Sequence, residues 1–191
     1  IFVVASPLFG QYEPHYTMNF VFNKLPYNPA YAGSKECTDI VALYRKQWAG
    51  LDGAPTTINA SFHTPFASNK CGIGLSLTND QIGMLNNTYA QLAYAYRIPV
   101  GNGTLSAGIQ AELEFARIDW TKAVALDPND PNVQAAAANS TKPNFGVGLY
   151  YTNPRFFAGI SAPRFLKTSY YQKGSVTAGN GQKDQRTYYG M

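Results

Sequence analysis

The sequence predicts an all-β protein: an antiparallel up-and-down transmembrane β-barrel, partial, with about eight strands present. Three observations predict this class. Apolar and polar residues alternate along several segments, short and long connections between those segments alternate, and the composition is poor in charge and rich in aromatic side chains. Charged residues make up 14% of the chain and aromatic residues also 14%, whereas an ordinary soluble domain holds roughly 25% charged residues. Composition alone fits a secreted β-sandwich almost as well.

The clearest strand is expected at residues 104–115. One parity is apolar, with Leu105, Ala107, Ile109, Ala111, Leu113 and Phe115, and the other is polar or small, with Thr104, Ser106, Gly108, Gln110, Glu112 and Glu114. This period of two indicates a strand that faces two different solvents, because a helix would spread both sets around its circumference. The segment is also about as long as a tilted strand that crosses a bilayer.

Seven further segments follow the same alternation more loosely: 39–48, 57–64, 71–78, 91–97, 144–151, 155–161 and 186–191. Short turns are expected at 68–70, 101–103 and 153–154, and long connections at 49–56, 79–87, 119–143 and 163–185. Alternating short and long connections are typical of outer-membrane barrels, in which the periplasmic turns are tight and the extracellular loops are long. A Greek-key sandwich gives no reason for this alternation. Since the last segment is cut short, we expect the barrel to continue beyond Met191.

Three regions are expected along the chain. Residues 1–10 read as a signal peptide remnant, because an apolar stretch ends at the small residue Gly10 without an initiator Met or a basic region before it. An ordinary buried first strand is the alternative. Residues 11–38 form an N-terminal segment, periplasmic or a plug, and residues 39–191 form the partial outer-membrane β-barrel.

The N-terminal segment contains a candidate binding site at Asn28, Pro29, Ala30, Tyr31 and Gly33. The Asn-Pro pair forces an extended or turn conformation, and the glycine ends it. A rigid aromatic segment of this kind can sit inside the barrel or seal its periplasmic mouth. A plain leader loop is the alternative.

A second candidate site lies in the expected extracellular loop 119–143, at Asp127, Asn129 and Asp130. These oxygen-rich side chains resemble calcium ligands, but their spacing misses the EF-hand pattern. The prolines between them explain the stretch as a turn. We expect the loops 119–143 and 163–185 to contact secreted cargo.

The residues give no support for catalysis, a metal or a cofactor. The only histidines, His15 and His63, have no paired nucleophile, and His63 is expected to line the lumen near its periplasmic end. Glu112 and Glu114 share one strand face, where we expect them to be solvated in a wet lumen. The net charge of +4 comes from scattered Lys and Arg, so nucleic-acid binding is not expected.

The two cysteines, Cys37 and Cys71, are too few for a disulfide scaffold and make no metal site with the distant histidines. An exported protein can pair them. The alternative is that they are separate small apolar residues near strand ends.

The chain resembles the PorP/SprF family of the type IX secretion system from about Gln11 to its last residue. The matching motifs lie at 22–24, 28–33, 42–48, 53–57, 63–65, 72–76, 79–83, 93–99, 127–130, 144–150 and 157–163. Each motif is weak alone, but their order is specific. One departure is Arg164, where a histidine is expected after the Ser-x-Pro motif, and it affects only local loop chemistry.

The resemblance implies an outer-membrane protein of Bacteroidota that aids export or surface attachment of cargo carrying a type IX sorting domain, including gliding-motility adhesins. Its implied partners are outer-membrane lipid, that cargo, and other type IX components, among them a periplasmic peptidoglycan-associated protein. The resemblance implies no catalytic residues and no cofactor. Because members are longer, it also implies that C-terminal strands are missing here. A general outer-membrane porin is the alternative function, followed by a soluble adhesin sandwich.

Overall fold

The computed structural model describes residues 19–119, 138–166 and 187–191. They form one antiparallel sheet of eight strands that pair in chain order from β1 to β8. The strands are β1 (Asp39–Lys46), β2 (Thr56–Phe66), β3 (Cys71–Ile82), β4 (Leu85–Val100), β5 (Gly103–Ile118), β6 (Ala138–Thr152), β7 (Phe157–Arg164) and β8 (Thr187–Gly190). This confirms the predicted all-β, up-and-down topology.

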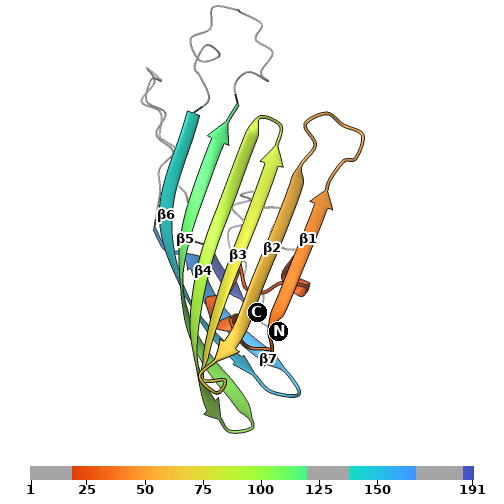
Figure 1. Cartoon of the computed structure of the whole chain (residues 1–191). Coiled ribbons are helices and arrows are strands. Elements are labelled where there is room, and N and C mark those ends of the chain that lie inside the picture. The colour runs from red at the N-terminus through yellow and green to blue at the C-terminus, as the bar shows by residue number, and fades with distance from the viewer. Residues whose placement is uncertain (1–18, 120–137, 167–186) are drawn as a thin grey trace, which may run out of the picture.

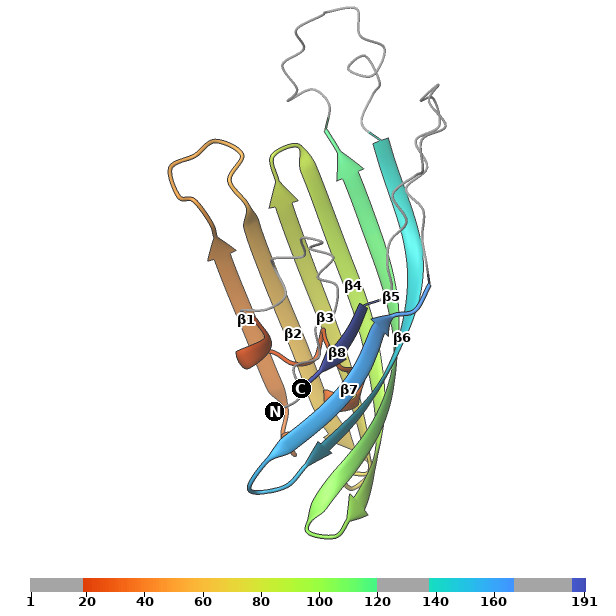
Figure 2. The same ribbon diagram turned by 180° about the vertical axis from the view of Figure 1, so that it is seen from behind.

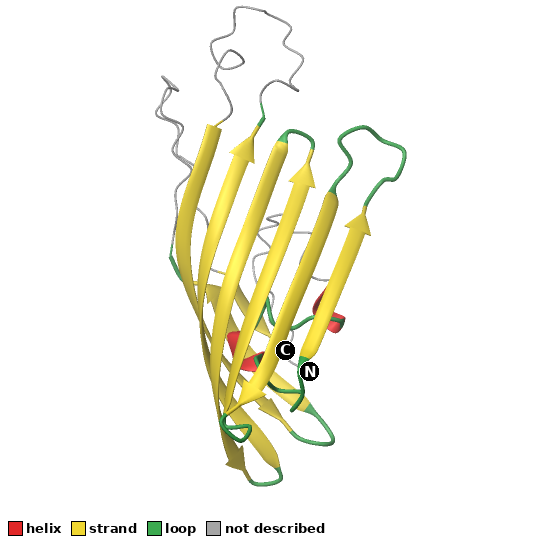
Figure 3. Cartoon of the chain, in the orientation of Figure 1, coloured by secondary structure: helices red, strands yellow, loops and turns green. Residues whose placement is uncertain are grey.

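The sheet is curled but open. β1 to β6 form a tall curved wall in Figure 1, and the view from behind in Figure 2 shows β7 and β8 in front of that wall. Within the described ranges, β1 and β8 do not pair with each other, which is the form expected of part of a barrel. Among the described residues, helix is limited to two short 3-10 turns, η1 (Asn19–Val21) and η2 (Pro29–Tyr31), shown in red in Figure 3. No described helix has the length and apolar character that a membrane span requires.

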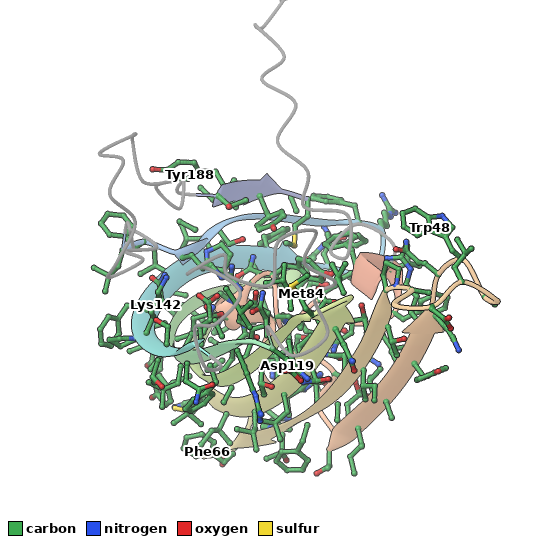
Figure 4. All side chains as sticks on the ribbon, turned by 90° about the horizontal axis from the view of Figure 1, so that it is seen from above. Trp48, Phe66, Met84, Asp119, Lys142 and Tyr188 are labelled. Atoms are coloured by element: carbon green, nitrogen blue, oxygen red, sulfur yellow. The ribbon has the colours of Figure 1, made fainter. Side chains whose placement is uncertain are left out.

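The two faces of the sheet differ as the alternation predicted. In β5, Ile109 is 61% exposed on the outer face, whereas Glu112 is 2% exposed on the inner face. Large apolar side chains are exposed on the outer face of each strand from β1 to β7. Figure 4 shows Phe66 at this outer margin. At about 3.4 Å per residue and a tilt of about 40°, the span from Leu105 to Phe115 rises about 26 Å, close to the apolar band of known outer-membrane barrels.

One predicted connection is wrong. Residues 79–82 and 85–87 continue β3 and β4, and only Gly83 and Met84 join these strands. The reason is that the side chain of Asn79 donates to Asn86 Oδ1 at 2.8 Å and to Thr88 Oγ1 at 2.9 Å across the strands. These amides resemble loop residues in sequence but form cross-strand hydrogen bonds on the outer face, where they continue the parity of the exposed Leu77 toward the long-loop end. The β3–β4 connection is therefore short, and it breaks the predicted alternation of short and long connections.

The predicted loop 119–143 is also too long, because β6 already begins at Ala138. Likewise β7 extends to Arg164, inside the predicted loop 163–185. Residues 120–137 and 167–186 lie outside the described part of the chain, as do residues 1–18. Both cysteines are free, Cys37 exposed and Cys71 buried, which confirms the alternative in which they do not pair.

Candidate functional site

Residues 19–38, here called the inner segment, run along the concave inner face of the sheet (Figures 1 and 2). Their local structure follows from the sequence. Asn28 is extended, with φ −141° and ψ 108°, as the residue before a proline must be. Its Oδ1 accepts from the Ala30 N–H at 3.0 Å and so caps η2, which has Pro29 in its first turn. Gly33 then reverses the chain with φ +70°.

Glycines form the floor under this turn. Gly108 of β5 and Gly148 of β6 are direct partners in the sheet register. A Cβ on Gly148 would collide with the side-chain oxygen of Asn28, and one on Gly108 would collide with the backbone of Pro29 and Ala30. The turn therefore lies in van der Waals contact with the strand backbone, an approach that only glycine permits.

Hydrogen bonds fix the segment to several strands. Asn28 is fully buried, and its Nδ2 donates to the Leu149 carbonyl of β6 at 3.0 Å. Arg97 of β4 is also buried, and its Nη1 donates to the Gly33 carbonyl at 2.8 Å. The same Nη1 lies 3.3 Å from the carbonyl of Asn69 in the β2–β3 turn. The lower end of the segment is thus tied to the short-turn end of the sheet.

Aromatic rings fill the space beside these bonds. The Tyr31 ring meets His63 and Tyr150 edge-on, at centroid distances of 5.3 and 5.5 Å. Burial raises the pKa of Tyr31. The Lys24 ammonium lies 3.5 Å from the centroid of the Phe157 ring, and burial, followed by the charge of Lys35, lowers the pKa of Lys24.

His63 lines the interior, as predicted, but it supports the inner segment. It is 1% exposed, and its Nδ1 accepts from the Gly33 N–H at 3.3 Å. Its Nε2 lies 3.2 Å from the Asp39 carboxylate. The inner segment occupies the space that a substrate would need to reach this imidazole, so the arrangement favours a structural role.

A second polar cluster lies higher on the inner face, toward the long-loop end. Glu112 accepts from Gln91 Nε2 at 2.6 Å and lies 2.9 Å from Arg164 Nε. The Arg164 guanidinium also lies 4.5 Å from the centroid of the Tyr89 ring. The prediction that Glu112 and Glu114 are solvated is wrong: both are buried.

The reason for this error is Arg164, which sequence reasoning assigned to loop chemistry. It is at the end of β7 and reaches past β6 to Glu112 of β5. A buried carboxylate requires a cation or several donors. The position of Glu112 on the inward side of its strand indicated that its carboxylate needs a cation nearby, but the sequence does not show which strand supplies that cation.

The predicted site residues are thus divided. Asn28, Pro29, Ala30, Tyr31 and Gly33 come together against β3 to β6. Asp127, Asn129 and Asp130 fall outside the described residues, and so does His15. Within the described ranges, no group of three or more His, Cys, Asp or Glu side chains is arranged to hold a metal ion.

One comparison with known proteins gave a match. The family model described as type IX secretion system membrane protein PorP/SprF matches residues 8–191. No curated protein and no solved structure matches the chain. The match covers the inner segment and all eight strands.

Proposed function

The chain belongs to the type IX secretion system membrane protein family PorP/SprF, and from this premise we propose that it is a non-enzymatic barrel of the bacterial outer membrane. In this role it aids the export or surface attachment of secreted proteins, gliding adhesins among them. The apolar outer face of β1 to β7 supports a location in lipid. The tight turns at one end of the sheet agree with a barrel that spans the outer membrane, because such barrels have short periplasmic turns.

The observation that carries the proposal is the inner segment packed on the concave face of the sheet. The turn at Asn28 lies on the strand backbone, and Arg97 and Ser161 hold its two ends by hydrogen bonds of 2.8 and 2.6 Å. We interpret the inner segment as a plug. A plugged barrel suits a protein that anchors partners better than one that conducts solutes.

The partners follow from the same premise. We propose cargo with a type IX sorting domain on the outer side, and other secretion components, including a periplasmic peptidoglycan-associated protein, on the inner side. Cargo contact is assigned to the connections between β5 and β6 and between β7 and β8. The Asp127, Asn129 and Asp130 group belongs to the first of these.

Surface display of cargo tests this role. In a strain whose own copy is replaced, a short linker substitutes for residues 120–137, so that β5 and β6 stay intact. The matched control shortens the β1–β2 connection at residues 49–54, at the same end of the sheet. We expect the first variant to lose most of its cargo from the cell surface and the control to keep it. Unchanged display in the first variant contradicts the assigned contact.

A solute porin remains the alternative, because Gln110, Glu112 and other polar side chains line the interior. Planar-bilayer recordings of the purified protein separate the two functions. The plugged barrel is expected to give no steady conductance. Ohmic steps in the wild-type protein favour the porin.

A further inference from the structure

The inner segment bridges opposite walls of the curl. On one wall, Asn23 Nδ2 donates to Asn59 Oδ1 of β2 at 2.7 Å. On the other, Ser161 Oγ of β7 donates to the Tyr27 carbonyl at 2.6 Å. The Tyr27 ring also meets the Tyr189 ring of β8 edge-on, with centroids 5.5 Å apart. β2 is not a neighbour of β7 or β8 in the sheet, so the segment joins strands that the ladder does not.

The inner segment also supplies apolar contacts to the concave face. Leu25 and Ala32 of the segment form a buried cluster with Ala93 and Ala95 of β4. Around this cluster the face is largely polar. A strand face of polar side chains and glycines gains little by curling on itself, because it buries little apolar area.

The inner segment lies closest to the sheet at three glycines, where no side chain separates it from the strand backbone. Gly72 lies under Ala32, Gly108 under Ala30 and Gly148 under Asn28, in each case too close for a Cβ. These glycines are on three different strands, β3, β5 and β6. A loosely inserted plug would not need glycine at each of its closest approaches.

We propose that the inner segment is an intramolecular ligand that sets the curl of the sheet during folding. Its binding site is the strip formed by Gly72, Gly108 and Gly148, and its ligand class is a peptide with an Asn-Pro turn. The strands reach their final curvature around the bound segment. A plug that enters after closure would leave folding unaffected. The inference does not depend on the cargo role, since its test needs no cargo.

The first test removes the segment and returns it as a peptide. The protein without residues 19–38 is diluted from urea into detergent micelles, and folding is followed by circular dichroism and by heat-modifiable migration in gels. A peptide of residues 19–38, with Cys37→Ser, is added in trans. We expect folding at least about tenfold slower without the peptide, recovery with it, and no recovery with the Asn28→Ala peptide. Normal folding without any peptide, or no recovery with the wild-type peptide, overturns the proposal.

The second test changes the glycine strip and keeps the inner segment. Gly148→Ala places a methyl group against Asn28, whereas Gly190→Ala is a matched control in β8, because a Cβ at Gly190 meets nothing within 4 Å. We expect Gly148→Ala to fold about tenfold more slowly and added peptide to have no effect, since its site is blocked. Gly190→Ala is expected to fold at the wild-type rate. Equal rates for the two variants contradict a role in folding.

Discussion

Asn28→Ala measures how much the contact between the inner segment and the sheet contributes to the free energy of unfolding. The fully buried side chain caps η2 through the Ala30 N–H at 3.0 Å and donates to the Leu149 carbonyl at 3.0 Å. Alanine leaves the buried Ala30 N–H without this acceptor, which costs about 1–3 kcal/mol. It also removes the bond to Leu149, worth about 1 kcal/mol. We therefore expect the free energy of unfolding to fall by about 2–4 kcal/mol.

The matched control is Asn153→Ala in the turn between β6 and β7. Asn153 Oδ1 also accepts from backbone N–H groups, those of Arg155 and Phe156, both at 2.8 Å, but these bonds are exposed. Water can replace them, so the loss is expected to stay below about 1 kcal/mol. Urea unfolding in lipid vesicles, followed by circular dichroism, measures both variants. An Asn28→Ala protein as stable as Asn153→Ala refutes the reasoning.

Two further predictions concern the two faces of the sheet. On the inner face, Glu112→Ala removes the carboxylate 2.9 Å from Arg164 and is expected to cost about 3 kcal/mol, measured by the same unfolding assay. The double variant with Arg164→Ala is expected to cost less than the sum of the single changes, and strict additivity would count against a coupled pair. On the outer face, Ile109→Arg is expected to cost about 2–4 kcal/mol in vesicles, because position 109 lies near the middle of the apolar band. Leu51→Arg, at a similarly exposed residue of the β1–β2 connection, is expected to change stability little, and equal losses would contradict the lipid-facing assignment.

The strands were largely predictable because a period of two has one physical cause. Each residue of β5 faces either lipid or the interior, so the parity of Ile109 and Glu112 could be read from the chain alone. The ends of strands were less predictable. Asn79 and Asn86 carry the amide groups that are common in loops, and only the register of β3 with β4, which sets Asn79 opposite Thr88, shows that the two amides meet across the strands.

The inner segment was predictable in part. The Asn-Pro turn and the positive φ of Gly33 are local properties, and the sequence indicates both. Its seat is not local. Nothing near Asn28 in the chain points to Gly148, more than a hundred residues away, and a glycine in a strand has several explanations. The Glu112–Arg164 pair was missed for the same reason.

The central claim is that successive residues of β5 face, in turn, lipid and the packed concave face of the sheet. The most direct test places a nitroxide label at one position at a time in vesicles, in a background without the native cysteines. Dissolved oxygen is expected to speed the spin relaxation of labels at 109 and 113, whereas a water-soluble nickel chelate is expected not to reach them. Labels at 110 and 112 are expected to be protected from both. Nickel access at 109 and 113, or no difference between the two parities, would contradict the account.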